Sequence, residues 1–305
     1  MINYKTLSSQ LRPFLALTGL TAAEFRDLLP AFERAYDRAY PMDRTATDRP
    51  RQRFFGGGRH AVLSAAEDKL LFVLVYLKTY PLQAVLGQLF GLGTSQVNYW
   101  LHQLLPVLRS ALDDLGVLAE RDGARLRRQA PEPRLVIIDA TERRRQRPKR
   151  AEKQAAHYSG EKKAHTDKNV LVVRAADRRV LFLSRTYAGK AHEKRIADEA
   201  RLRYPPGTTL YKDAGFQGYE PPVAKTCQAK KKPPGRELTA AEKRANRELA
   251  RIRVRVEHAI AGVKRSRVVK DVFRNKKPGS SDVSMEVASG LHNLRVTHRK
   301  RGSKR

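Results

Sequence analysis

The chain has 305 residues, of which 41% are hydrophobic and 30% carry a charge. Lys and Arg outnumber Asp and Glu by 62 to 31, so the formal net charge is +31 at pH 7. Repulsion on that scale destabilises a compact fold unless a polyanion neutralises it, so the composition predicts a nucleic-acid partner. The single cysteine, Cys227, excludes a disulfide framework and any zinc or iron–sulfur site built from cysteines.

No segment of the sequence predicts a membrane association. The longest apolar run covers residues 70–77, lies between Lys69 and Lys78, and is too short to span a bilayer. The first residues (MINYKTLSSQLRP) contain no apolar core of a signal peptide. We therefore expect a cytoplasmic protein, and the chain length predicts about two domains.

The first part of the chain is predicted to be helical. The segments Thr21–Glu24 and Ser64–Glu67 have the spacing of a capping box, which marks the start of a helix. After the second box, apolar residues recur with helical spacing over residues 70–77 and again over 82–89. A glycine-containing turn follows, and Thr94 is positioned to cap a third helix.

A short helix, a turn with glycine and a capped helix have the layout of a helix-turn-helix motif. In that motif the first turns of the second helix meet base edges or phosphates. The alternative is an ordinary helical bundle whose last helix has a polar start. The predicted DNA-contacting residues are Ser95, Gln96, Asn98 and Tyr99. Residues 44–60, rich in Arg, Pro and Gly, are predicted to be an exposed connector that also contacts phosphates.

The composition changes near residue 130. Residues 120–134 are polar and end in two prolines, so we expect a helical domain over 1–130 and a second domain over 131–298. The basic residues 299–305 are expected to form a disordered tail.

The second domain is predicted to contain short strands between helices. Strands are expected at 135–138, 168–175, 180–186 and 208–212, with a helix at 192–204 and a long helix from the capping box Thr239–Glu242 to about Lys264. The second and third strands form a hairpin in this prediction. The order of elements fits an α/β fold of the ribonuclease-H-like type, a mixed sheet with flanking helices.

Two predicted strands end on an acidic residue. These residues are Asp139 and Asp213, and the long helix carries Glu257. In a ribonuclease-H-like fold the ends of the first and fourth strands lie side by side under a later helix. Three carboxylates gathered in this way suit Mg²⁺, which prefers oxygen ligands and supports two-metal phosphodiester chemistry. The alternative is that each Asp only ends a strand and begins a turn.

Four segments in this order resemble those of bacterial insertion-sequence transposases. The segments are 138–142, 158–168, 212–219 and 257–264. The resemblance covers about residues 63–298, points to the DDE superfamily and is closest to the insertion-sequence-five group. It implies a catalytic triad of Asp139, Asp213 and Glu257, which also bind two Mg²⁺ ions with Mn²⁺ as a substitute. No other cofactor is implied.

The same resemblance implies a helix signature, Tyr-x2-Arg-x3-Glu-x6-Lys. Arg253, Glu257 and Lys264 match it, whereas Ala250 stands at the Tyr position. Arg253 and Lys264 are then expected to contact backbone phosphate near the cut. The alternative is a surface Arg–Glu pair one helical turn apart.

Further candidates flank the predicted active site. Lys163 and His165 lie in the segment beside the first Asp and are expected to contact DNA, although a lone His is commonly a plain polar residue. Glu142 is expected to point away from the site and to contact basic neighbours, and Asp167 and Asp177 are expected to be solvated turn residues. Two basic runs, 143–150 and 230–232, either contact DNA or only form a solvated surface. The predicted contacts in the first run are Arg143, Arg144, Arg145 and Arg147.

These observations predict a transposase that binds the terminal inverted repeats of its own element in double-stranded DNA. It would hydrolyse the ends and join the exposed 3′-hydroxyls to target DNA, as a homodimer on DNA in the bacterial nucleoid. One alternative is a metal-dependent nuclease that cuts without joining. Another is a DNA-binding protein that kept the fold and lost the chemistry.

Overall fold

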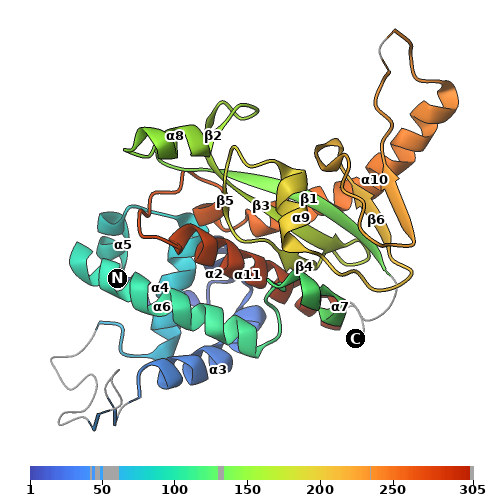
Figure 1. Ribbon diagram of the computed structural model, residues 1–305. Helices are drawn as coiled ribbons and strands as arrows, with labels where there is room; N and C mark the ends of the chain where they lie inside the picture. The colour runs from blue at the N-terminus through green and yellow to red at the C-terminus, as the bar shows by residue number, and fades with distance from the viewer. Residues whose placement is uncertain (42, 45–48, 51–61, 130–133, 234, 303–305) are drawn as a thin grey trace. The chain divides into compact units, whose positions relative to one another are not determined.

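The computed structural model describes residues 1–305 except 42, 45–48, 51–61, 130–133, 234 and 303–305 (Figure 1). The chain forms two compact units. Unit 1 comprises residues 1–118, 264–271 and 283–305, and unit 2 comprises residues 119–263 and 272–282. This division differs from the expected boundary near residue 130, because the C-terminal helix returns to the helical unit. Most of the expected connector at 44–60 lies outside the described residues.

Unit 1 is helical. Its elements are α1 (Tyr4–Leu7), α2 (Leu11–Thr18), α3 (Ala22–Ala39), α4 (Ala66–Thr79), α5 (Gln83–Phe90), α6 (Thr94–Asp114), η3 (Arg267–Val269) and most of α11 (Ser280–Gly302). Helix α4 is central, since every residue from Lys69 to Leu77 is buried. The apolar spacing along α4 predicted one buried face, and the structure buries all faces. Residues 299–302 of the expected disordered tail belong to α11, and residues 303–305 lie outside the described residues.

The predicted helix-turn-helix is present as α5 and α6. Gly91 ends α5 in the left-handed conformation (φ 70°), which glycine adopts without steric cost. Helix α6 begins one residue earlier than predicted: Gly93 is its N-cap, and the backbone N–H of Gly93 donates to Gln96 Oε1 at 2.9 Å. The capping box at Thr21 forms as predicted. The predicted box at Ser64 does not form, because Ala65 is the N-cap of α4.

Unit 2 is built on a mixed sheet (Figure 1). Its strands are β1 (Leu135–Arg144), β2 (Tyr158–Ser159), β3 (Ala164–Arg174), β4 (Val180–Leu183), β5 (Tyr187–Ala188), β6 (Thr209–Lys212) and β7 (Lys225–Gln228). Strand β1 pairs antiparallel with β3 and parallel with β6, and β6 pairs parallel with β7. Strands β4 and β5 pair antiparallel with β3. This arrangement confirms the predicted ribonuclease-H-like α/β fold.

Helices flank the sheet. They are η1 (Gly123–Arg125), α7 (Leu126–Gln129), α8 (Ala151–His157), α9 (Glu193–Ala200), η2 (Ala214–Phe216) and α10 (Ala240–Val263). Ile196 and Ala197 of α9 pack into a core with Val136 and Ile138 of β1 and with side chains of β3 and β4. Helix α10 also packs against β1. Among the described residues, no helix is both long and apolar enough to cross a bilayer.

Strand β1 extends beyond its predicted end. Residues 139–144 continue the strand because they pair in register with residues 166–171 of β3. The sequence predicted a strand only over the apolar residues 135–138. Pairing with the long strand β3 extends β1 through the polar and charged residues that follow. Asp139 therefore lies within a strand, although parallel pairing with β6 ends at Ile138.

Asp167 is buried in β3 and not in a solvated turn, contrary to the prediction. Its side chain is 1% exposed. Oδ1 accepts from Arg145 Nη1 at 2.8 Å and Oδ2 from Ser281 Oγ at 2.6 Å, and His157 Nδ1 lies 3.1 Å from Oδ1. Burial raises the pKa of Asp167, but the bonds from His157 and Ser281 and the nearby guanidiniums outweigh it and lower the pKa to about 2. The ionised carboxylate therefore stabilises the fold.

We expect Asp167→Asn to lower the free energy of unfolding by about 3 kcal/mol at pH 7, because it leaves buried cations without their carboxylate. The folded-state pKa lies below the unfolded value, so this stabilisation is present above about pH 4 and is lost as pH falls through about 2. Urea unfolding at several pH values measures it. Asp198→Asn, at an exposed position of α9, serves as the control and should change stability by less than about 0.5 kcal/mol. Equal stability of the Asp167 variant and the wild type at pH 7 would contradict the assignment.

Candidate active site

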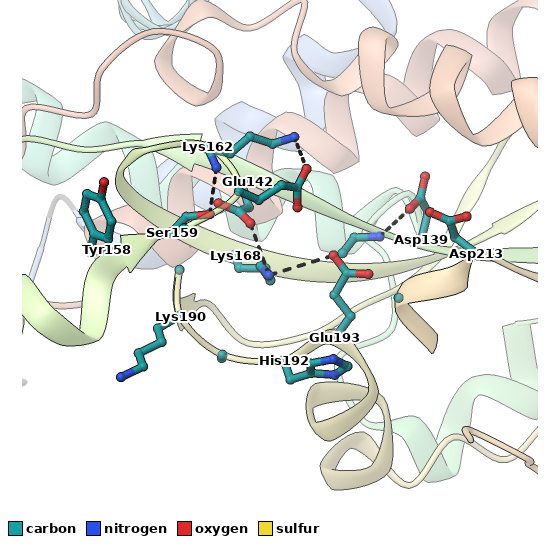
Figure 2. Close-up of a pocket in the computed structure, with 16 residues that line it drawn as sticks. Asp139, Glu142, Tyr158, Ser159, Lys162, Lys168, Lys190, His192, Glu193 and Asp213 are labelled. Atoms are coloured by element: carbon teal, nitrogen blue, oxygen red, sulfur yellow. Dashed lines mark hydrogen bonds and ion pairs between the residues drawn. The ribbon is translucent and has the colours of Figure 1, made fainter. Parts of the chain in front are cut away.

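Asp139 and Asp213 lie side by side where the parallel pairing of β1 with β6 ends. The parallel pairing of β1 and β6 aligns Ile138 with Lys212, so the next residue on each strand is one of these two acids. Both side chains line one pocket of about 570 Å³. Figure 2 shows the two carboxylates adjacent at one end of that pocket. Residues 74 positions apart in the sequence are thus brought together by strand pairing alone.

The loop after β6 holds Asp213 in place. Lys212 is buried, and its Nζ donates to the backbone oxygen of Tyr219 at 2.6 Å and pairs with Glu220. Phe216 is fully buried in the core beneath the loop. Gly218 has φ 78°, a conformation that other residues rarely adopt, and it lets the chain turn back toward Tyr219. The segment 212–219 is therefore a rigid support for the carboxylate.

Burial and like charge act on Asp139. Burial is the largest of the causes that raise its pKa, and the neighbouring carboxylates of Asp213 and Glu193 add to it; with all influences included, the pKa is about 6. The N–H of Ala140, which donates to Asp139 Oδ1 at 2.8 Å, and the charge of Arg253 oppose this shift. The ionised pair is thus electrostatically costly in a site of this kind, and a bound cation would stabilise it.

Arg253 supplies part of the positive charge. It projects from α10, and its Nη1 lies 2.9 Å from Asp213 Oδ1. The sequence predicted that Arg253 contacts DNA phosphate near the cut; the structure shows its contact with a site carboxylate, and the phosphate contact stays a prediction.

The donor set fits a hard divalent cation by its chemistry. Asp139 and Asp213 offer carboxylate oxygens, the ligands that Mg²⁺ and Mn²⁺ prefer, and Mg²⁺ retains several waters. Among the described residues, no group of three His, Cys, Asp or Glu side chains is already arranged to hold a metal. The two aspartates are the part of the predicted triad that the fold brings together.

Glu257 is not among the residues that line the pocket. It is exposed on α10, one helical turn after Arg253, which reaches Asp213. Its helix is therefore anchored at the site, and the face that carries Arg253 also carries Glu257. The role of Glu257 as third acid stays a prediction.

The pocket contains charged residues that the sequence did not single out as site residues. Lys168 Nζ lies 3.1 Å from Glu142 Oε1 and 3.8 Å from Glu193 Oε1, as Figure 2 shows. Glu142 was expected to point away from the site and to contact basic neighbours. The basic contact is present, but Glu142 lines the same pocket as Asp213 because β1 continues past Asp139.

Glu193 is the acid that sequence reasoning missed. It begins α9, and burial raises its pKa, with Asp213 and Glu142 adding to the effect against the charge of Lys168. Its carboxylate lies against Gly215, where an added Cβ would come within 2.0 Å of Glu193 Oε2. No local pattern in the sequence marks Glu193 as a site residue.

The predicted DNA contacts of the first basic run divide into two groups. Arg143 is 2% exposed, and its guanidinium binds Asn169 and donates to Ser281 Oγ at 2.9 Å. It therefore supports the fold and is not a DNA contact; burial lowers its pKa to about 10. The prediction failed because Arg143 lies in β1 with its side chain turned inward. Arg144 and Arg147 are exposed. The guanidinium of Arg145 forms an ion pair with the buried carboxylate of Asp167.

The remaining predicted contacts lie outside the pocket that holds the aspartates. His165 is in β3 opposite Tyr158, and Lys163 is exposed in the preceding turn with φ 46°. Lys264 follows α10 and falls in unit 1. In unit 1, the four residues predicted for the helix-turn-helix are all exposed at the start of α6; they are Ser95, Gln96, Asn98 and Tyr99.

The comparisons with known proteins agree with this geometry. The family described as "DDE superfamily endonuclease" matches residues 138–293, from the residue before Asp139 to within α11. This chain belongs to the DDE superfamily of endonucleases. A second family, "helix-turn-helix of DDE superfamily endonuclease", matches residues 62–114 and so covers α4, α5 and α6. The predicted membership of the DDE superfamily and the predicted helix-turn-helix are thereby confirmed.

A relative from an insertion sequence is similar over most of its length. A probable transposase for insertion sequence element IS702 from Microchaete diplosiphon is 25% identical over 257 residues, covering 84% of this chain and 89% of the relative. No solved structure matches the chain. Endonucleases of the DDE superfamily generally depend on divalent metal ions. The pair of aspartates in this endonuclease has the donor chemistry for such ions.

We expect Glu193→Gln to weaken Mn²⁺ binding about three- to tenfold, because it removes a negative charge beside Asp139 and Asp213. Calorimetry or the electron paramagnetic resonance signal of free Mn²⁺ measures the affinity without any DNA. Glu199→Gln, at an exposed position on the same helix, is the matched control and should leave the affinity unchanged. Equal Mn²⁺ affinities for both variants would remove Glu193 from the site.

Proposed function

We propose that this DDE-superfamily endonuclease is the transposase of an insertion sequence, acting on the terminal inverted repeats of its own element in the bacterial nucleoid. The adjacency of Asp139 and Asp213 carries the proposal, because it is the arrangement that phosphodiester chemistry at a divalent metal site needs. The resemblance to a probable transposase over most of both chains supports the element-specific role.

In this proposal Asp139 and Asp213 bind the metal ions, and Glu257 completes the site from α10. When bound, two Mg²⁺ ions, or Mn²⁺ in their place, supply activation of the attacking oxygen and stabilisation of the leaving oxygen. Arg253, which contacts Asp213, orients that carboxylate and presents a guanidinium to backbone phosphate beside the cut. Lys168, between Glu142 and Glu193, balances the excess negative charge of the pocket.

The reaction proceeds in two phosphoryl transfers. Hydrolysis breaks a P–O bond at the end of the element and leaves a 3′-hydroxyl. That hydroxyl then attacks a target phosphodiester, so one P–O bond forms as another breaks and no external energy source is needed. Since two ends are joined to one target, a homodimer on DNA is the expected assembly.

Asp213→Asn is expected to abolish Mg²⁺-dependent cleavage of labelled element ends, with a loss of more than about a hundredfold, because one shared metal ligand is removed. Glu257→Gln should have the same effect. DNA binding, measured in parallel by a mobility shift, should change less than threefold. Asp198→Asn, on the surface of α9, controls for the loss of an aspartate elsewhere in unit 2.

The same assay separates the proposed function from its alternatives. Cleavage followed by joining to a target plasmid supports a transposase. Cleavage without joining indicates a nuclease, and binding without cleavage indicates a DNA-binding protein. Undiminished cleavage by the Asp213 variant would remove this residue from the active site.

Asn98→Ala and Tyr99→Ala are expected to weaken binding to the element's terminal repeat about tenfold each, because both side chains are exposed at the start of α6, where this motif meets bases. Gln103→Ala, farther along α6, is the control. Filter binding or fluorescence anisotropy measures the affinities. If six to ten phosphates are neutralised, affinity for any sequence falls about 10³–10⁵-fold between 50 and 200 mM salt. Equal losses on repeat and unrelated DNA would contradict a sequence-reading role for α6.

A further inference from the structure

Basic side chains of unit 1 gather where α4 ends. They come from the last turn of α4, from η3 and the residues on either side of it, and from α11. Helix η3 packs against α4, which brings these segments together although they lie far apart in the sequence. We refer to them as the basic cluster, and its members are Lys78, Arg265, Arg267, Lys270 and Arg295.

Contacts with the backbone hold two members of the basic cluster in place. Lys78 Nζ donates to the backbone oxygen of Arg265 at 3.3 Å. Arg295 is buried, and its Nη1 donates to the backbone oxygen of Gly19 at 3.4 Å. An added Cβ at Gly19 would lie 3.2 Å from Lys78 Cδ and 3.8 Å from Arg295 Nη1, so both side chains pack over the turn that follows α2. The fold therefore fixes these cations close together.

The charges of the basic cluster repel one another. The pKa of Lys78 is lowered, first by burial and then by the charges of the other four members. Asp271 compensates part of this charge, since its Oδ2 lies 2.9 Å from Arg267 Nε. Arg265 and Lys270 are exposed, and Lys78 is partly exposed. Charges of one sign that a fold holds together at its surface favour an anionic partner.

The basic cluster lies at the end of α4 that leads into the helix-turn-helix. Lys78 precedes the first residue of α5, Gln83, by five positions. Nearer the other end of α4, Lys69 Nζ lies 5.9 Å from the centre of the Trp100 ring, next to the exposed start of α6. The nine positions from Lys69 to Lys78 correspond to about 14 Å along a helix axis. This length is close to the width of the major groove of B-DNA, about 12 Å.

We propose that the basic cluster binds the phosphate backbone of the duplex that α6 enters, beside the bases that α6 reads. Arg265 and Lys270 contact the phosphate oxygens, and Lys78 and Arg295 keep the surface between them positive. The proposal rests on the proposed function, because it takes the helix-turn-helix to be the part of unit 1 that meets DNA. It adds a surface that positions the protein on the duplex without reading its sequence.

A duplex suits the basic cluster better than a single small anion. Double-stranded DNA carries one negative charge per about 1.7 Å of its axis, so one backbone neutralises several neighbouring cations at once. A single phosphate would leave most of the repulsion around Lys78 uncompensated. The distance along α4 also lets one duplex reach both surfaces, with the start of α6 in the groove and the basic cluster at the phosphates that border it.

The salt dependence of binding to an unrelated duplex tests whether the basic cluster contacts phosphate. Each contact adds about 0.9 to the slope of log affinity against log salt concentration. The double variant Arg265→Gln/Lys270→Gln is expected to reduce that slope by about 2 and to weaken binding about ten- to 100-fold near about 100 mM salt. Fluorescence anisotropy measures both quantities on the full chain without divalent metal, so that no strand is cut.

Two matched double variants serve as controls. Arg265→Lys/Lys270→Arg keeps both charges and should retain the slope to within about 0.5. Lys5→Gln/Arg34→Gln removes two exposed charges of unit 1 that lie on α1 and α3, outside the basic cluster, and should leave the slope unchanged within the same margin.

Ethylation interference on the terminal repeat locates the contacts. In the wild type, ethylation of phosphates beside the bases read by α6 should weaken binding. In Arg265→Gln/Lys270→Gln the same phosphates should lose their effect, because their partners are gone. Asn98→Ala should instead reduce the preference for repeat DNA and leave the salt slope on unrelated DNA unchanged.

Three results would overturn the proposal. An unchanged slope and affinity in Arg265→Gln/Lys270→Gln shows that the basic cluster does not contact DNA. An equal loss in the charge-retaining variant shows that shape, and not charge, makes the difference. Lost phosphates that lie far from the bases read by α6 show that the basic cluster serves a different duplex. The slope is measured on unrelated DNA without cleavage, so a failure of the proposed transposase activity is seen separately in the assay with element ends.

Discussion

The site depends on a single strand pairing. Parallel hydrogen bonding between β1 and β6 places Asp139 next to Asp213, and without it two acids far apart in the sequence would not meet. The ionised form of Asp139 is electrostatically costly, because burial first of all, and the nearby carboxylates of Asp213 and Glu193 in addition, raise its pKa to about 6. The surrounding structure offsets that cost with cations from two directions: Arg253 on α10 contacts Asp213, and Lys168 on β3 lies between Glu142 and Glu193.

The distribution of basic residues follows from that arrangement. The net charge of +31 suits a polyanionic partner, but several arginines are used inside the fold. Arg143 is buried among Asn169 and Ser281, and Arg145 pairs with the buried Asp167. These residues fix the extended part of β1 against β3 and thereby hold the end of the sheet that carries the aspartates. Only the exposed members of the same run, such as Arg147, remain accessible to a phosphate backbone.

The pocket of unit 2 and the helix-turn-helix of unit 1 have different chemistry. The acidic pocket has the donors for divalent cations. The helix-turn-helix at α5 and α6 presents exposed polar side chains at the start of α6, which suits sequence reading. Binding and chemistry are thus assigned to separate residues of this endonuclease.

The sequence by itself determined the class of partner, the helical and α/β parts, the glycine turn before α6 and the two aspartates at the strand edge. These features are local: charge balance, apolar spacing, and acids that directly follow apolar runs. Only the tertiary structure decided that Arg143 and Asp167 are buried, that β1 continues to Arg144, and that Glu142 and Glu193 share the pocket while Glu257 does not line it. Those outcomes depend on which strands pair and on which charged side chains from different elements neutralise one another. The sequence does not distinguish a charged residue that is solvated by water from one that pairs with a buried ion. The return of the C-terminal helix to unit 1 is also a matter of long-range packing, which no local pattern in the chain encodes.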